Sequence, residues 1–500
     1  MSLRRLLGLS ATVSGRLPLR RCLSTAAAAA ASHPPWTRSP STVASSNPSR
    51  RHPLPAAAAS HPPWRRPLST AAPKHPSWAM IDHTSLVDES SAAPGALFGP
   101  VEPPLVSRIT APAHLLNPRE RPAADSSVVQ LFSGRVNATS GDGHLLLTYY
   151  DILGEPPRES WSGNADVEAE RCICNPISGE VLRLPYPGGP CGSRKSLGHR
   201  HMGLLTQAGG GCGRAPPDRY AVADIVSQRD RIVDRFLPEV GRWDLLLGVP
   251  CHCQPPLAWE MEMDQETVAF DGRLWWVDLT CGAVSMDPFS DQPELRFVPL
   301  PSGTSLTFIL MEHKNASAEH RAQFRREVAR YRRIGVSEGR LRYIDASIHD
   351  PFLLSSYVLD EEGRSWTLEH EVELRKVLED GGHPCQQGKR PPQIAVIDPL
   401  NAGIMYITVG EQKHIVAVDI YQEKVIASSP LQNGYHSLVH AFFHPGLDPA
   451  RSLRQELHPC LQNGRRATIS VVVLTTDSSE KGLKVFLLRV DLYFMKKPNS

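Results

Sequence analysis

The sequence predicts an all-β, β-propeller-like fold of about six blade units with helical insertions, preceded by a disordered N-terminal leader. Two observations support this. From about residue 79 to the C-terminus, short apolar runs alternate with Gly, Pro and Asp turn signals. In addition, a pattern of a Gly turn followed by an apolar strand recurs along the chain. Many short strands in recurring units favour radial repetition over a single open sheet.

The stretch 270–301, FDGRLWWVDLTCGAVSMDPFSDQPELRFVPLP, is the most informative part of the chain. Asp271-Gly272 predicts a tight hairpin turn, because Gly adopts positive φ without a Cβ clash. In the strand that follows, Leu274 and Trp276 point to one face, and Trp275 and Val277 point to the other. Both faces are apolar, so the strand is expected to be packed between two layers, with Leu274 and Trp276 buried.

A repeat becomes visible when this strand is compared with the rest of the chain. DGRLWWVD at 271–278 is echoed by EGRLRYID at 338–345. Each copy is followed by a second strand that ends near a proline, which removes a donor from the ladder. We count six probable units, and these are 125–185, 216–248, 266–301, 337–375, 391–430 and 466–494.

One segment, 317–333, is predicted to be an amphipathic helix. Phe324, Val328 and Tyr331 have helical spacing, and Ser317 is a candidate N-cap. Its arginines are expected on the outer face, and these are Arg321, Arg325, Arg326, Arg330, Arg332 and Arg333. This Arg-rich helix is either an RNA-contacting surface or a solvated surface helix. The net negative charge of the rest of the chain, given below, favours the solvated surface helix.

The N-terminal part of the chain differs sharply in composition. Residues 1–81 contain eleven basic residues and no Asp or Glu, so the remaining 419 residues carry 43 basic and 52 acidic residues, a net charge of −9. Residues 1–25 are basic, rich in Ser and Thr and amphipathic, which is typical of a mitochondrial or plastid transit peptide. Residues 26–78 form a repetitive Ala/Pro/Ser tract that predicts a flexible linker.

This divides the chain into 1–78, a transit peptide and disordered linker, and 79–500, the propeller-like domain. We expect a mitochondrial location, with the plastid as the alternative. No sequence window has the ~18 apolar residues of a membrane-spanning helix.

No catalytic or cofactor motif stands out, so no cofactor is predicted. The best candidate metal ligands are Cys191, His199, His201 and Cys212, but their spacing matches no common zinc pattern. We leave a metal site open and expect Gly209–Gly213 to be a flexible loop.

Two other chemically interesting groups have simpler interpretations. Cys172 and Cys174 would share one face of a strand and are expected to fill the core. In Glu369-His370-Glu371, neighbouring side chains point to opposite faces of a strand, which favours a solvated edge over acid–base chemistry.

The stretch 270–301 resembles the signature of a plant family, greatly expanded in grasses, that carries domain of unknown function 1618. YAVAD at 220–224, GVSEGRLRYI at 335–344 and WTLEH at 366–370 resemble it too, and the resemblance spans about residues 79–430. It implies blade-like strands similar to the propeller modules of F-box proteins, although no F-box precedes the domain here. It implies no catalytic residue and no ligand.

The function that we expect is a non-enzymatic protein–protein interaction module in an organelle. The alternatives are RNA binding through the helix 317–333 and an enzyme built from loop carboxylates and histidines. Fold alone does not decide among them.

Overall fold

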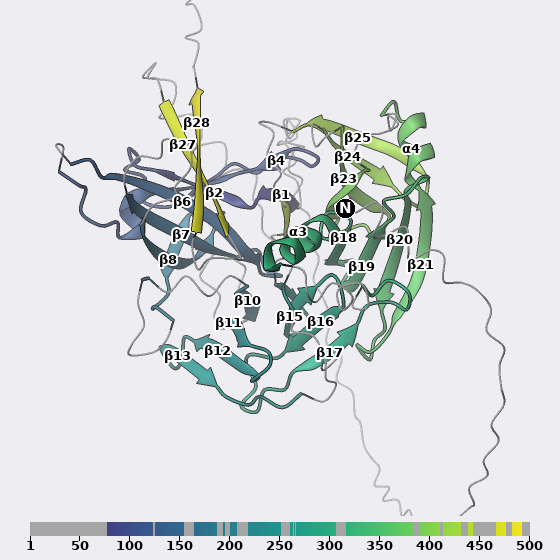
Figure 1. The fold of residues 1–500 in the computed structure, drawn as a ribbon, viewed down its shortest axis with the longest axis horizontal. Coiled ribbons are helices and arrows are strands. Elements are labelled where there is room, and N and C mark those ends of the chain that lie inside the picture. The colour runs from purple at the N-terminus through teal and green to yellow at the C-terminus, as the bar shows by residue number, and fades with distance from the viewer. Residues whose placement is uncertain are drawn as a thin grey trace, which may run out of the picture. The chain divides into compact units, whose positions relative to one another are not determined.

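A computed structural model describes residues 78–123, 126–154, 165–187, 194–195, 201–207, 219–251, 261–263, 265, 267–306, 317–383, 391–410, 414–431, 439–443, 467–476 and 483–492. The predicted leader and all but the last residue of the predicted linker lie outside these ranges. The described chain is built mainly of strands, with short helices, and the predicted all-β, propeller-like class is confirmed (Figure 1).

Four sheets each contain four strands that follow one another in the chain, and each strand is hydrogen-bonded to the next. The first comprises β10 (Gly203–Gln207), β11 (Arg219–Ser227), β12 (Ile232–Leu237) and β13 (Arg242–Leu246). The second comprises β14 (Val268–Phe270), β15 (Arg273–Asp278), β16 (Gly282–Met286) and β17 (Arg296–Pro299). The third comprises β18 (Arg332–Ser337), β19 (Arg340–Ala346), β20 (Leu353–Leu359) and β21 (Trp366–Glu373). The fourth comprises β22 (Gln393–Ile397), β23 (Ile404–Val409), β24 (His414–Asp419) and β25 (Lys424–Pro430).

A seven-stranded sheet has the order β3-β5-β2-β6-β7-β8-β9. Its strands are β2 (Thr84–Asp88), β3 (Leu97–Phe98), β5 (Ile109–Pro112), β6 (Val129–Thr139), β7 (Leu145–Gly154), β8 (Asp166–Asn175) and β9 (Glu180–Arg183). A three-stranded sheet places β1 (Trp78–Asp82) between β26 (Val439–Phe443) and β4 (Val106–Ser107). The hairpin of β27 (Ala467–Thr476) and β28 (Leu483–Leu492), the 3₁₀ helix η2 (Ala113–Leu116) and the helices α3 (Ala318–Val328) and α4 (Leu374–Asp380) complete the described elements.

The predicted hairpin turns are present. Asp271 and Gly272 have φ of 49° and 67°, and Glu338 and Gly339 have φ of 50° and 68°. Two consecutive positive φ angles twist a two-residue turn in the direction that antiparallel strands require. The echo between the two sequence copies is therefore the same hairpin in two neighbouring sheets.

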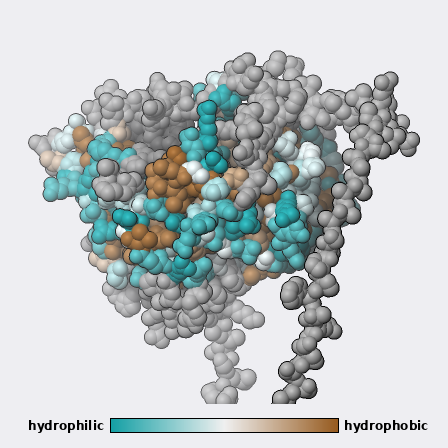
Figure 2. Space-filling model, turned by 90° about the horizontal axis from the view of Figure 1, so that it is seen from below, coloured by the Kyte–Doolittle hydropathy of each residue, from teal (hydrophilic) through white to brown (hydrophobic). Residues whose placement is uncertain are grey.

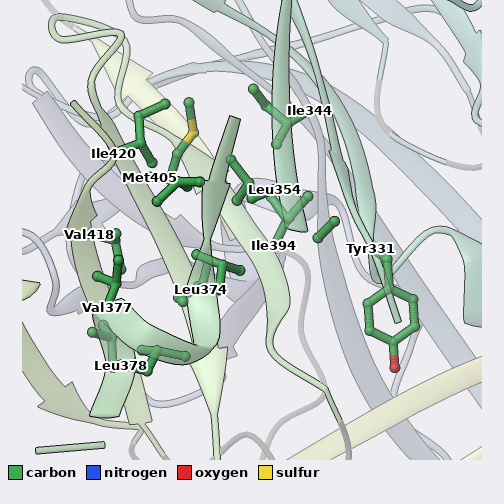
Figure 3. Packing of buried hydrophobic residues seen from close by; sticks show 14 of the residues in the cluster. Tyr331, Ile344, Leu354, Leu374, Val377, Leu378, Ile394, Met405, Val418 and Ile420 are labelled. Atoms are coloured by element: carbon green, nitrogen blue, oxygen red, sulfur yellow. The ribbon is translucent and has the colours of Figure 1, made fainter. Parts of the chain in front are cut away.

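Neighbouring sheets bury their facing surfaces against each other. The β10–β13 and β14–β17 sheets share a core around Trp276, which is 1% exposed. Another core joins β14–β17 to β18–β21 through Trp275 and Tyr343. A third lies between β18–β21 and β22–β25, where α4 contributes Val377 beside Val418 (Figure 3). Each sheet thus needs a neighbour on both faces, as the apolar residues on both faces of its strands predict.

One strand of each of six sheets contacts a strand of the next sheet in a closed order. β6 contacts β10, β10 contacts β14, β14 contacts β18, β18 contacts β22, β22 contacts β26, and β26 contacts β6. The last step depends on β1, which pairs with β26 in antiparallel register, with Met80 opposite Ala441. Trp78 and Met80 also pack on the β22–β25 sheet. The start of the domain and a strand from its C-terminal part therefore join in one sheet.

Three sequence predictions need correction here. Segment 466–494 was expected to be a sixth unit, but it forms only the hairpin β27–β28, and the place between β22–β25 and β6 is taken by β26 with β1 and β4. The unit predicted at 216–248 did not include β10, which belongs to the same sheet but precedes a Gly-rich insertion in the chain. The helix predicted over 317–333 ends at Val328, because Ile334, Gly335 and Val336 favour the strand β18.

Trp276→Ala should lower the free energy of unfolding by about 3–5 kcal/mol, the usual cost of deleting a buried large aromatic side chain. Its indole Nε1 also donates a hydrogen bond to the His201 carbonyl oxygen at 2.9 Å. Trp276→Phe also loses this hydrogen bond but leaves a much smaller cavity, so it should cost less than Trp276→Ala. Urea denaturation of the two variants and the wild type measures this, and an unfolding midpoint unchanged in Trp276→Ala would contradict the described core.

Candidate functional site

Only one of the four candidate metal ligands, His201, lies in the described residues; Cys191, His199 and Cys212 do not. The His201 carbonyl oxygen accepts hydrogen bonds from Thr267 Oγ1 at 2.6 Å and from Trp276 Nε1 at 2.9 Å. The His201 backbone thus anchors the β14–β17 sheet. Among the described residues, no three His, Cys, Asp or Glu side chains gather to hold a metal ion.

The cysteine pair of β8 is part of the core. Cys172 and Cys174 are fully buried and pack with Leu145 and Leu147 of β7. Burial raises the pKa of both thiols, and that of Cys174 reaches about 12. Both side chains stay uncharged in the cell and act as small apolar residues, as predicted.

The Glu369-His370-Glu371 group does not form an acid–base site. The Glu369 carboxylate forms ion pairs with Arg340 and Arg342, and His370 Nε2 lies 2.6 Å from the Ile420 carbonyl oxygen. Glu371 accepts a hydrogen bond from Ser355 Oγ at 2.9 Å. The three side chains therefore have separate partners and do not converge on one point.

The arginines of the 317–333 segment are less exposed than predicted. In α3, Phe324 and Val328 are buried and Ser317 is the N-cap, as expected. Arg325, however, is 2% exposed and forms an ion pair from Nη1 to Asp278 Oδ2 at 3.1 Å. Asp278 is itself fully buried at the end of β15.

Arg332 and Arg333 belong to β18 and are also buried, so they do not join α3 in a basic outer face. Arg332 donates from Nη1 to the Leu279 carbonyl oxygen at 2.9 Å and pairs through Nε with Asp345 at 3.1 Å. Burial raises the pKa of Asp345, while the Arg332 charge opposes the rise. Arg325 from α3 and Arg332 from β18 thus hold the β15–β16 turn.

Asp142, in the turn between β6 and β7, centres a polar cluster that the sequence analysis missed. Its Oδ1 accepts hydrogen bonds from Ser140 Oγ at 2.5 Å and from Thr206 Oγ1 at 2.6 Å, and it lies 3.1 Å from His144 Nδ1. Burial disfavours the charged form, but the hydrogen bonds from His144, Ser140 and Thr206 outweigh it and lower the pKa of Asp142 to about 2. Because Thr206 belongs to β10, the cluster ties two sheets together.

The feature that most resembles a binding surface is apolar and lies on the β10–β13 sheet. Figure 2 shows one face of the molecule, on which hydrophobic residues gather in patches among hydrophilic ones. Of the large apolar side chains that are exposed, Leu245 of β13 (54%), Leu247 just after it (70%) and Val226 of β11 (51%) lie at the same end of this sheet. We call these three residues the apolar edge.

Strand alternation gives only part of the signal for this surface. In RWDLLLGVP (242–250), only alternate residues of a strand reach the interior. Leu246 does so and packs with the core shared with β14–β17. Leu245 and Leu247 then point to the opposite face together with Trp243, but Trp243 is buried in the core shared with the preceding sheet, whereas the two leucines are exposed.

Comparison with known proteins gives a partial family match. A family model described as "Protein of unknown function (DUF1618)" matches residues 276–406, which run from β15 into β23. No curated protein matches the sequence.

Several solved structures are similar at low identity. Apo AztD from Citrobacter koseri is 9% identical with a TM-score of 0.27, over 65% of this chain and 89% of that chain. A putative 6-phosphogluconolactonase from Bacteroides fragilis NCTC 9343 is 12% identical with a TM-score of 0.26, over 75% and 99%. A chain of a nidogen/laminin complex is 12% identical with a TM-score of 0.28, over 62% and 85%. At these values the likenesses carry no functional information.

Arg325→Ala should lower the free energy of unfolding by about 3–5 kcal/mol, because it leaves the buried Asp278 carboxylate without its cation. The matched control is Arg326→Ala, one residue along α3 and exposed, which should change it by about 0.5 kcal/mol or less. Both values come from urea denaturation. Equal effects of the two substitutions would rule out the buried ion pair.

Asp142 should make stability depend on pH in the acid range. Because its folded pKa of about 2 lies below the ordinary 3.8, the carboxylate stabilises the fold above about pH 4, and this contribution is lost as the pH falls towards 2. The difference in unfolding midpoint between wild type and Asp142→Asn should therefore shrink as the pH is lowered over that range. A difference that stays constant with pH would contradict the cluster.

Proposed function

We propose that this chain is a non-enzymatic organellar protein whose propeller-like domain binds a protein partner. The observation that carries the proposal is the apolar edge of the β10–β13 sheet. Exposed apolar groups that gather at one site, instead of being scattered singly, are typical of protein interaction surfaces. Leu247, which is 70% exposed, could be shielded from water only by a partner or by residues outside the described ranges.

RNA binding, the second function considered, receives less support. Arg325, Arg332 and Arg333 are buried, so an RNA surface on this segment would depend on Arg326 and on the partly exposed Arg321 and Arg330. The net charge of −9 on residues 82–500 also opposes binding to a polyanion.

The family and compartment form the second part of the proposal. The match of residues 276–406 supports placing the chain in the plant family of domain of unknown function 1618. The acid-free, Arg-rich segment 1–25 supports import into mitochondria, with the plastid as the alternative. A nuclear-encoded plant protein with such a leader would reach its partner only after import.

Residues 1–60 fused to a fluorescent reporter should direct the reporter to mitochondria in plant cells. The control replaces Arg4, Arg5, Arg16, Arg20 and Arg21 with Gln, which removes the positive charge of the leader and should abolish import. Diffuse cytosolic fluorescence of the unmodified fusion would contradict the proposed location.

The tagged full chain, isolated from mitochondria and analysed by mass spectrometry, should retain a protein partner that resists nuclease treatment. The nuclease step separates this proposal from the RNA alternative, because a partner bridged by RNA is released. Recovery of RNA alone, or of no stable partner, would overturn the protein-binding function.

A further inference from the structure

The last strands of the sheets differ in how they end. An open sheet edge invites pairing with another chain, and natural proteins block it with charged residues and prolines. Four of the outermost strands, β9, β17, β21 and β25, end in such an exposed residue, and these are Arg183, Pro299, Glu373 and Pro430. The fifth, β13, ends instead at Leu246, with the exposed Leu245 and Leu247 on either side.

The apolar edge continues across the end of the sheet. Val233 and Leu246 form the last pair of the β12–β13 ladder at this end, and Ile232 and Leu247 are the residues next to them on the two chains. Ile232 in turn lies opposite Ser227, at the bulge of β11 that contains Val226. A row of apolar side chains therefore runs from Val226 through Ile232 to Leu247 and ends at the outer side of β13.

The charges around this row are basic. Arg229 and Arg231 in the β11–β12 turn and Arg242 at the start of β13 are exposed, and none forms an ion pair with another described residue. The nearby acidic groups are engaged. Asp230 accepts from Ser227 Oγ at 2.8 Å, Asp244 pairs with Arg235 at 3.0 Å, and Glu239 pairs with Arg219 at 2.9 Å.

We propose that β13 binds an extended acidic peptide segment of the protein partner, which adds to the sheet as a further antiparallel or parallel strand. Its alternating apolar side chains lie beside Leu245 and Leu247, and its acidic residues face Arg229, Arg231 and Arg242. Backbone hydrogen bonds provide affinity in this mode and alternate side chains provide specificity. This inference rests on the proposed protein-binding function and names its surface and partner class.

Charge favours an acidic peptide over a second copy of this chain. Two β13 strands paired in antiparallel fashion about their centres would bring two Asp244 residues opposite each other, and like charges in opposed positions destabilise a sheet. An acidic strand meets Arg229 and Arg231 at one end of β13 and Arg242 at the other, where the neighbouring Asp230 and Glu239 are already engaged by Ser227 and Arg219. The arginines at the two ends are about 20 Å apart at ~3.4 Å per residue, so the acidic groups of the peptide should lie about six residues apart.

The test uses the full chain and a fluorescent synthetic peptide with glutamates at each end and alternating valine and threonine between. Fluorescence anisotropy should show saturable, salt-sensitive binding. The double substitution Leu245→Asp with Leu247→Asp should weaken it at least about tenfold, and Arg229→Glu with Arg231→Glu about tenfold. The control Leu182→Asp, on the exposed outermost strand β9, should leave binding unchanged. Circular dichroism establishes that each variant is folded.

Other outcomes would overturn the inference. A peptide with proline at alternate positions should not bind, because it lacks the N–H groups for strand pairing; equal binding of this peptide would exclude strand addition. Dimerisation of the chain that is lost in the Leu245/Leu247 variant would identify a second copy as the occupant. Binding of oligouridine in place of the peptide would identify a nucleic-acid surface.

The pull-down separates failure of this surface from failure of the proposed function. If the Leu245→Asp, Leu247→Asp variant still recovers the mitochondrial partner, protein binding stands and β13 is not its site. If the wild type recovers none, the proposed function itself fails.

Discussion

The pairing of β1 with β26 is the contact on which the arrangement of the sheets depends. Each four-stranded sheet has apolar residues on both faces, so a row of sheets stacked face to face would leave two apolar faces in water at its ends. The closed order of contacts from β6 through β26 and back to β6 removes these ends. β1 completes it by joining the start of the domain to its C-terminal part, with the Trp78 ring 5.5 Å from that of Tyr406.

Polar side chains then fix how neighbouring sheets sit against each other. Asp278 and Asp345 occupy the same position in the two copies of the hairpin, at the last strand residue or next to it. Asp278 pairs with Arg325 of α3, and Asp345 pairs within its own sheet with Arg332, whose Nη1 also donates to the Leu279 carbonyl oxygen after β15. Asp142, in the turn after β6, likewise links its sheet to β10, because it accepts a hydrogen bond from Thr206 Oγ1. Buried ion pairs add little net stability, but breaking one is costly, so they specify a single packing of the sheets.

Local sequence signals predicted the strands well, because each depends on residues close in the chain. The turns at Asp271-Gly272 and Glu338-Gly339 and the burial of Trp276 follow from Gly conformation and from alternation. The roles of Arg325 and Asp278 could not be predicted, since 47 positions separate them and an arginine on a helix normally faces water. β1 was missed for a related reason: the strand partners of WAMID are distant in the sequence, at 106–107 and 439–443.

The same reasoning separates structural from functional residues. Cysteines, histidines and arginines that look chemically promising in the sequence are largely used to hold sheets together, whereas the unusual feature is a run of three leucines, two of them at the surface. These groups thus serve the packing of the described sheets, and the apolar and basic edge of β13 is the surface on which the proposed protein binding rests.

Hydrogen exchange followed by mass spectrometry, on the wild type and on a variant lacking residues 78–82, tests the closure most directly. If β1 holds the two ends of the domain together, deleting it should remove protection from 439–443 and lower it in β22–β25, whose sheet packs on Trp78 and Met80. Unchanged protection in both segments would show that the sheets are held together without this strand.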